Sequence, residues 1–96
     1  MVYSVIYHPD VLQDDLPHIP QNIKGTLKRA IERRLRLDPF TYGQPLRRSL
    51  KGYRKLRVGD YRVIYRIQRD EIIVLKIGHR KEVYEKVFPR LKGRDR

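Results

Sequence analysis

The chain has 96 residues, of which 23 are Lys or Arg and 11 are Asp or Glu, giving a formal net charge of +12. This length fits a single domain, because domains typically contain about 100–150 residues. The absence of cysteine excludes disulfide bonds and thiolate metal sites, and the 3 histidines are scattered, so we expect no metal and no cofactor. No apolar run approaches the ~18 residues of a membrane span, and the start lacks a signal-peptide pattern. We therefore expect a cytoplasmic protein that does not enter a membrane.

The excess of positive charge is the strongest compositional signal. A domain with an isoelectric point near 10.4 has the electrostatic character of a nucleic-acid binder, because clustered Lys and Arg attract the phosphate backbone. Two alternatives remain: the charge serves only solubility, or it serves an acidic protein partner. The distribution favours nucleic acid, since acidic residues gather near the start and in turns, whereas the basic ones crowd the predicted sheet and the tail.

The first half of the chain predicts a strand followed by two helices. Residues 2–7 alternate as a short strand, and a first helix is expected over residues 9–16, because a proline suits its first turn. From Pro20 the apolar residues recur with helical spacing until Asp38, which precedes a proline and so avoids the helical region. The opposite face of this second helix is basic, comprising Lys24, Lys28, Arg29, Arg33 and Arg36. A short turn joins the two helices into a hairpin that can cover one face of a sheet.

The second half predicts three strands and a final helix. Residues 39–52, rich in glycine, proline and polar side chains, are expected to form a connecting loop. Three strands should follow over 53–58, 61–68 and 71–77, with turns at Gly59-Asp60 and Arg69-Asp70, and then a short helix over 81–92 that is interrupted or ended at Pro89. The order β-α-α-β-β-β-α describes an α+β domain over residues 1–92, with its helices on one face of a small, mainly antiparallel four-stranded sheet. A short basic tail, residues 93–96, follows it.

Strand alternation divides the second half into two sets of residues. One face of a strand carries Tyr61, Val63, Tyr65 and Ile67, which are expected in the core. Cations occupy other sheet positions, with an aromatic residue just beyond the last strand: Lys55, Arg57, Arg62, Arg80 and then Tyr84. Cations fixed on a rigid sheet beside aromatic rings suit a phosphate backbone. The competing interpretation of such a pattern is an ordinary solvated strand face.

Two motifs of this half carry a family resemblance. They read Arg57-Val58-Gly59-Asp60-Tyr61-Arg62-Val63-Ile64-Tyr65 and Gly78-His79-Arg80, the latter followed by Glu82-Val83-Tyr84. They resemble the RelE toxins of bacterial and archaeal toxin–antitoxin pairs, and the similarity extends over nearly the whole domain. The resemblance implies a ribosome-dependent endoribonuclease that cuts mRNA in the ribosomal A site without a metal. It also implies an acidic, RelB-like antitoxin that binds the toxin in a hetero-oligomer.

The resemblance also implies which residues carry the chemistry. The family's basic pair falls on Lys55 and Arg57, its next arginines on Arg62 and Arg80, and its C-terminal tyrosine on Tyr84. Arginine binds phosphate with a planar fork that stays charged, so Arg62 and Arg80 suit the transition state. Arg57 is expected to support them or to protonate the leaving oxygen. Lys55 and Tyr84 remain alternatives for the base, and Tyr84 has two other possible roles, stacking on a nucleobase or capping the core.

Other residues and functions stay open at this level. His79 is expected to face away from Arg80 as a packing residue, because neighbours on a strand point to opposite faces. The basic helix face is expected either to touch ribosomal RNA or to serve only solubility. The superfamily also contains ParE toxins, which share the fold but inhibit DNA gyrase and cut no RNA. A third hypothesis is a degenerate member that has lost toxicity and only binds.

Overall fold

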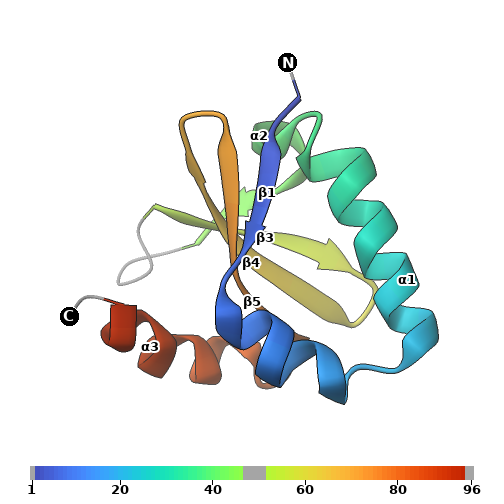
Figure 1. The fold of residues 1–96 in the computed structure, drawn as a ribbon, viewed down its shortest axis with the longest axis vertical. Coiled ribbons are helices and arrows are strands. Elements are labelled where there is room, and N and C mark those ends of the chain that lie inside the picture. The colour runs from blue at the N-terminus through green and yellow to red at the C-terminus, as the bar shows by residue number, and fades with distance from the viewer. Residues whose placement is uncertain (1, 47–51, 95–96) are drawn as a thin grey trace.

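The computed structural model describes residues 2–46 and 52–94, which form one sheet with helices around it (Figure 1). The strands lie in the order β1-β5-β4-β3-β2. The elements, in chain order, are β1 (Ser4–Tyr7), the helical turns η1 (Val11–Asp15) and η2 (Leu16–His18), α1 (Gln21–Ala30) continued by η3 (Ile31–Leu35), α2 (Pro39–Tyr42), β2 (Gln44–Pro45), β3 (Tyr53–Val58), β4 (Tyr61–Gln68), β5 (Glu71–His79) and α3 (Val83–Arg94). The predicted α+β class is confirmed, and two short elements, α2 and β2, are added. No helix in these described ranges is long and apolar enough to cross a membrane.

Strands β3, β4 and β5 form the predicted antiparallel meander. Gly59-Asp60 joins the first two strands and Arg69-Asp70 joins the next two, as the turn residues indicated. Gly59 has a φ of +59°, a conformation that glycine adopts without a steric cost. β5 extends to His79, beyond its predicted end, and β1 pairs with it in parallel at the edge of the sheet.

The sheet has a fifth strand where a loop was predicted. β2 pairs antiparallel with β3, so that Gln44 lies opposite Lys55. The short helix α2 precedes it: Asp38 caps this helix by accepting a hydrogen bond from the backbone N–H of Thr41 at 3.1 Å, and Pro39 occupies its first turn. The predicted count of four strands is therefore corrected to five. A strand of two residues and a helix of four are too short to show a hydrophobic period in the sequence.

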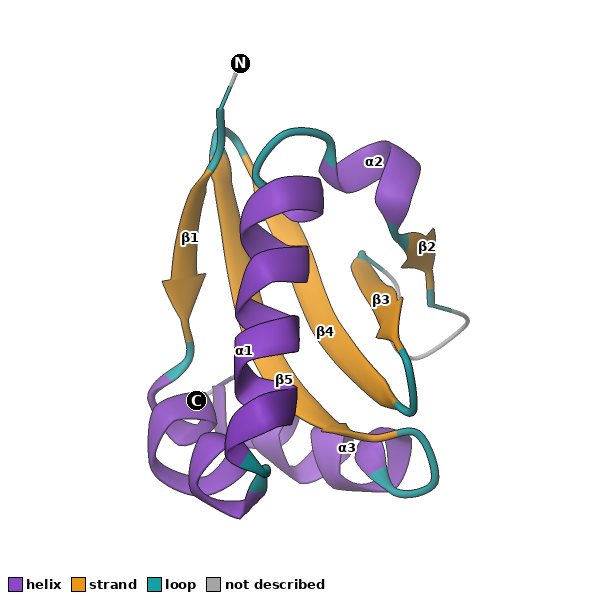
Figure 2. Ribbon diagram, turned by 90° about the vertical axis from the view of Figure 1, so that its right-hand side faces the viewer, coloured by secondary structure: helices purple, strands orange, loops and turns teal. Residues whose placement is uncertain are grey.

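The helical hairpin packs on one face of the sheet, and Figure 2 shows α1 lying across the strands. Leu27 and Leu35 of its second helix are buried in the main hydrophobic cluster of the protein. The predicted strand residues all belong to this cluster or pack against it, namely Tyr61, Val63, Tyr65 and Ile67. The first helix ends at His18 instead of Leu16, because Pro17 lies in the first turn of η2, where a missing N–H costs nothing.

Helix α3 packs on the opposite face of the sheet, so the prediction that all helices share one face was wrong. Val83 and Val87 of α3 form a second hydrophobic cluster with Ile64 and Leu75. A bulge permits this arrangement: Ile64 pairs with residue 76 but Tyr65 pairs with residue 74, which leaves Leu75 as the extra residue of β5. The sheet is thus apolar on both faces in its middle. The uninterrupted apolar run of β5 could not reveal which side chains point to which face.

Pro89 does not interrupt α3, which continues to Arg94. A proline inside a helix removes one hydrogen bond and leaves the carbonyl of Glu85 without its helical donor. Because Pro89 is exposed, water can satisfy that carbonyl. The helix therefore enters the segment predicted as a tail, whose last residues, 95–96, lie outside the described ranges.

Candidate active site

A pocket of about 430 Å³ opens on the sheet face opposite the hairpin, beside the start of α3. It is lined by side chains of β2, β3, β4, the end of the meander and α3: Gln44, Lys55, Arg57, Arg62, Arg80, Lys81 and Tyr84. The structure therefore brings together all five residues that the sequence singled out for chemistry. It adds a neutral amide and a further lysine to them.

Strand alternation explains why these cations share one pocket. Leu56 and Val58 on β3, and Val63 on β4, are buried toward the hairpin, so the residues between them face the other way. Arg57 and Arg62 lie directly opposite each other across the two strands. Like charges in this position destabilise a sheet, and within the described ranges no carboxylate forms an ion pair with either. A bound anion would offset this repulsion.

Arg62 is the most enclosed cation of the pocket, with a relative exposure of 7%. Its Nη1 donates to the carbonyl oxygens of Gly59 at 2.9 Å and Tyr61 at 2.8 Å. These carbonyls belong to the tight turn between β3 and β4 and its flank, so the turn holds the guanidinium in one place. Carbonyls satisfy donors without neutralising the charge. The positive charge of Arg62 is thereby fixed beneath the pocket.

Arg80 lies after β5 and is positioned by the same turn. Its backbone N–H donates to the carbonyl oxygen of Asp60 at 2.8 Å, and its Nε lies 3.5 Å from Oδ1 of that residue. Both side chains are more than half exposed, so this ion pair contributes little to stability. The ion pair instead orients the side chain of Arg80 toward the turn, so that Arg80 lines the same pocket as Arg62.

Tyr84 joins the pocket to the core of α3. The ammonium nitrogen of Lys55 lies 5.6 Å from the centroid of the Tyr84 ring, a cation–π contact. The ring also packs against the second hydrophobic cluster. Tyr84 thus both caps the core and lines the pocket. It lies beside Lys55, the other candidate for the base.

Gln44 and Lys81 are the pocket residues that sequence reasoning missed. Gln44 lies on β2, which has no recognisable strand pattern, and nothing in the sequence pointed to it. Lys81 directly follows Arg80, and this adjacency was the one available signal.

The basic face of the second helix lies away from the pocket. None of its members lines the pocket: Lys24, Lys28, Arg29, Arg33 and Arg36. Lys24 and Lys28 border a separate groove of about 300 Å³ between α1 and the first helix. Arg36 donates from Nε to the carbonyl oxygen of Tyr3 at 3.2 Å and so ties the hairpin to β1. Arg29 and Arg33 are exposed.

His79 has a packing environment instead of a place in the pocket. Its ring meets the ring of Tyr61 edge-on, with centroids 5.7 Å apart and planes at 74°, and Tyr61 packs against the main hydrophobic cluster. Its Nδ1 accepts a hydrogen bond from the backbone N–H of Lys81 at 3.2 Å. Among the described residues, no group of three or more His, Asp and Glu side chains is arranged to hold a metal ion.

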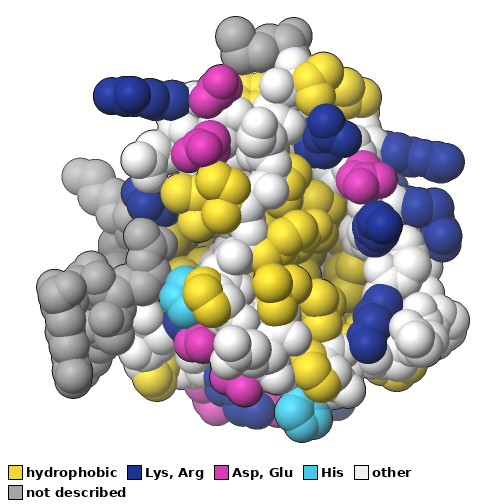
Figure 3. All heavy atoms as spheres, viewed as in Figure 1, with side chains coloured by type: hydrophobic (Ala, Val, Ile, Leu, Met, Phe, Trp, Pro, Cys, Tyr) yellow, Lys and Arg dark blue, Asp and Glu magenta, His cyan; other side chains and the backbone are white. Residues whose placement is uncertain are grey.

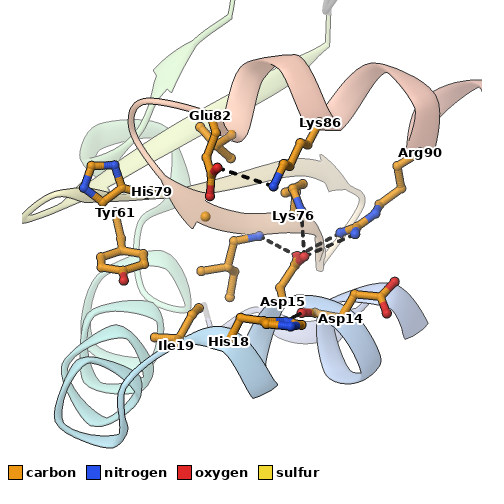
Figure 4. Close-up of a pocket in the computed structure, with 13 residues that line it drawn as sticks. Asp14, Asp15, His18, Ile19, Tyr61, Lys76, His79, Glu82, Lys86 and Arg90 are labelled. Atoms are coloured by element: carbon orange, nitrogen blue, oxygen red, sulfur yellow. Dashed lines mark hydrogen bonds and ion pairs between the residues drawn. The ribbon is translucent and has the colours of Figure 1, made fainter.

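A second hollow, of about 490 Å³, lies between the first helix, β5 and α3 (Figure 4). Its buried carboxylate, Asp15, accepts hydrogen bonds from Lys76 Nζ at 2.7 Å, from Arg90 at 2.8 and 3.1 Å, and from the backbone N–H of Ile77 at 2.9 Å. Burial alone would raise the pKa of Asp15, but these donors outweigh burial and lower the pKa below its usual range. Arg90 also pairs with Asp10 at 3.5 Å and Lys86 pairs with Glu82 at 3.4 Å. Each Lys and Arg side chain of this hollow therefore has a carboxylate partner, so the hollow joins elements instead of attracting an anion.

The protein is thus a small basic α+β domain with a helical hairpin on one sheet face and a cationic pocket on the other, and its fold matches that of a chain in a toxin–antitoxin complex. The chain belongs to the family described as the ParE toxin of the type II toxin–antitoxin system, parDE, whose sequence model matches residues 5–84. Its curated relatives include RelE toxins, so it is a toxin of the RelE/ParE group.

Individual relatives agree in sequence and in fold. The chain is 32% identical over 74 residues to toxin RelG of Mycobacterium tuberculosis, which covers 75% of this chain and 85% of RelG. It is 32% identical over 78 residues to toxin RelE3 of Methanocaldococcus jannaschii, covering 78% and 88% of the two chains. The toxin–antitoxin complex RelBE2 of M. tuberculosis contains a chain with a TM-score of 0.77 and 30% identity, covering 82% of this chain and 92% of that one.

Proposed function

We propose that this toxin is an endoribonuclease that cleaves mRNA in the A site of the ribosome, without a metal ion, and thereby stops translation in the cytoplasm. The convergence of four cations and a tyrosine on one pocket carries the proposal: Lys55, Arg57, Arg62, Arg80 and Tyr84. The cations supply positive charge for an RNA phosphate, and the tyrosine and the lysine supply groups that can exchange a proton.

In the proposed reaction the 2′-hydroxyl of a ribose attacks the adjacent phosphorus in line. The hydroxyl loses its proton to a base, the bond from phosphorus to the 5′-oxygen breaks, and that oxygen takes up a proton. Arg62 and Arg80 would stabilise the charge of the transition state, since their positions are fixed before the substrate arrives; one such donor contributes roughly 10²–10³-fold in rate. Arg57 would support them or protonate the leaving oxygen.

Lys55 and Tyr84 are the two candidates for the base that accepts the proton. They are in contact with each other at the pocket wall, so one can accept the proton while the other holds it in position. A general base typically contributes about 10²–10⁴-fold in rate. The contact also means that a substitution of either residue will disturb its neighbour. Alanine variants therefore test the pocket as a whole, and conservative replacements are needed to separate the roles of the two residues.

We also propose that an acidic antitoxin silences the toxin by binding the hairpin face. The related RelBE2 structure is such a toxin–antitoxin complex. In this chain, Leu12, Leu16 and Leu27 line the groove between the first helix and α1. Its charged lining residues are Lys24, Lys28 and Glu32, so its border carries a net positive charge. Figure 3 shows hydrophobic side chains along this hollow and Lys and Arg side chains on the α1 side. A groove with an apolar floor and a basic rim fits an amphipathic segment that carries negative charge.

The exposed cations of the second helix would contact ribosomal RNA. They lie on the far side of the sheet from the pocket, so the toxin could touch ribosomal phosphates with one face and hold mRNA with the other. Lys24 and Lys28 also border the antitoxin groove. An antitoxin bound there would compete with the ribosome for the same two charges.

The alternative function is inhibition of DNA gyrase without nuclease activity. The matched family is described by the name ParE, and such a toxin would act by binding a protein. It would have no use for a cationic pocket in which directly opposed arginines lack counter-ions. Damaged DNA with intact mRNA after expression would establish this alternative.

A brief pulse of expression tests the nuclease. We expect translation to stop and new mRNA 5′ ends to appear at fixed positions within codons of translated messages only. Arg80→Ala and Tyr84→Ala should abolish both effects, because each removes a pocket group that the reaction needs. Sequencing of RNA 5′ ends is the measurement.

Arg34→Ala provides the matched control, since Arg34 is an exposed arginine on η3 outside the pocket and outside the basic helix face. It should arrest translation as the unsubstituted toxin does. If the Arg80 and Tyr84 variants still cut mRNA, the assigned site is wrong. If the unsubstituted toxin is harmless, the chain is a degenerate binding module.

A further inference from the structure

Gln44 is the one neutral amide among the residues that line the cationic pocket. It lies on β2 directly opposite Lys55 of β3, and residues opposite each other in an antiparallel pair project from the same face of the sheet. Gln44 therefore lies beside Lys55, on the sheet face that also carries Arg57. The other lining side chains are cations, apart from Tyr84.

The segment that carries Gln44 is held firmly although it contains little regular structure. Arg54 donates from Nη2 to the carbonyl oxygens of Phe40 at 2.7 Å and Gly43 at 2.9 Å. The Tyr65 hydroxyl, buried beneath, donates to the carbonyl oxygen of Pro39 at 2.6 Å. Any side chain on Gly43 would overlap that hydroxyl, so glycine allows the backbone to lie against the ring. The residue next to Gly43 is thereby fixed.

Beyond Gln44 the ladder to β3 continues. The backbone N–H of Leu46 donates to the carbonyl oxygen of Tyr53 at 2.9 Å, and Leu46 packs against the second hydrophobic cluster. Gln44 is thus anchored on both sides while its own side chain is exposed to the pocket. An exposed polar side chain on a fixed backbone can meet a ligand at a defined position.

The chemistry of Gln44 differs from that of its neighbours. Lys and Arg bind phosphates and carry no sequence information by that contact, whereas an amide offers one donor group and one acceptor that can match a base edge. Single-stranded RNA exposes both edges of its bases. A glutamine amide pairs in two places with adenine, donating to N7 and accepting from the N6 amino group.

We propose that Gln44 is a specificity-determining residue, which reads an adenine next to the phosphate held by the cations. This inference rests on the proposed nuclease function and deepens it, since it names the base beside the cut. The cations would hold the backbone of any sequence. Gln44 would make adenine the preferred neighbour of the cleaved bond.

The experiment maps mRNA 5′ ends after a pulse of the unsubstituted toxin, Gln44→Ala and Gln44→Glu. The unsubstituted toxin should favour adenine at one fixed position beside the cut. In Gln44→Ala that preference should fall by about 5- to 100-fold, the discrimination that a two-point base contact supplies. Gln44→Glu should shift the preference toward cytosine, because a carboxylate only accepts and cytosine presents an amino group.

Gln68→Ala is the matched control, since Gln68 is an exposed glutamine at the end of β4 outside the pocket, and it should keep the adenine preference. The inference is overturned if the unsubstituted toxin cuts without an adenine preference, or if both Gln44 variants cut with the same preference as the control. A toxin that cuts no mRNA at all overturns the proposed function, and this inference with it. Thermal unfolding of each variant confirms that it is folded.

Discussion

Tyr84 lines the pocket, and its ring lies beside the ammonium group of Lys55 and against the core of α3. With the ring occupied by these contacts, stacking on a nucleobase would require displacing the lysine. The hydroxyl takes part in neither of these two ring contacts. At the scale of single residues, this geometry favours a role for the oxygen of Tyr84 over a role for its ring.

The replacement Tyr84→Phe separates the two roles, because it removes the hydroxyl and keeps the ring. We expect the rate of cleavage of ribosome-bound mRNA to fall by about 10²–10⁴-fold in a single-turnover assay. Lys55→Met keeps most of the side-chain length and removes the ammonium, and serves as the comparison. Cleavage by Tyr84→Phe within a few fold of the unsubstituted rate would return Tyr84 to a stacking or packing role and leave Lys55 as the base.

The pocket cations could be predicted from the sequence, whereas Gln44 could not. Arginine and lysine on strand positions were visible in the sequence as cations, and alternation placed them on one face. No sequence pattern pointed to Gln44, because a single glutamine in an irregular segment is not distinguished from any other polar loop residue. Its significance comes from pairing with Lys55, which only the folded sheet defines.

At the scale of elements, Asp15 connects three parts of the chain. It lies at the end of η1 and binds Lys76 of β5 and Arg90 of α3. Both partner side chains are largely buried, and without Asp15 only Arg90 would keep a carboxylate partner, Asp10 at 3.5 Å. The carboxylate therefore holds α3 against the sheet. The cationic pocket opens on this same face of the sheet.

Asp15→Asn should lower the free energy of unfolding by about 3–5 kcal/mol at pH 7, since breaking the buried ion pair leaves the ammonium group of Lys76 uncompensated. The pKa of Asp15 is lower in the folded protein than in the unfolded chain, so its contribution is complete above the unfolded pKa and is lost as the pH falls through the folded pKa. Urea unfolding measures this effect. Between pH 7 and pH 3, the free energy of unfolding should fall less in Asp15→Asn than in the unsubstituted protein.

Asp14→Asn is the control for this prediction, because Asp14 is exposed and adjacent in sequence. It should stay within about 0.5 kcal/mol of the unsubstituted protein. Equal losses of stability in Asp14→Asn and Asp15→Asn would show that the buried cluster does not hold α3.

At the scale of the whole molecule, the net charge of +12 is arranged on two faces. One set of cations lines the pocket on one side of the sheet, and another lies along the second helix on the other side. A single-stranded RNA short enough to fill only the pocket should release the counter-ions of the pocket set alone. The salt dependence of binding therefore reports how many cations take part.

For a short 2′-O-methyl RNA, which lacks the attacking hydroxyl, the logarithm of the association constant should fall with the logarithm of salt concentration. Five pocket cations predict a slope of about −3.5, and Arg57→Ala should reduce its magnitude by about 0.7. Fluorescence anisotropy across a salt titration measures both. Arg34→Ala should leave the slope unchanged; an equal reduction there would mean that the RNA binds diffusely over the surface.

Local periods and residue types were enough to predict the α+β class, the meander with its turns, the core tyrosines of β4 and four of the five pocket cations. The tertiary structure alone decided that α3 covers the second face, that a bulge at Leu75 makes both faces apolar, and that β2 completes the sheet. Those features depend on contacts between segments far apart in the chain. The same is true of the Asp15 cluster, whose members are 61 and 75 residues apart, and of Gln44, whose neighbours at the pocket come from other strands.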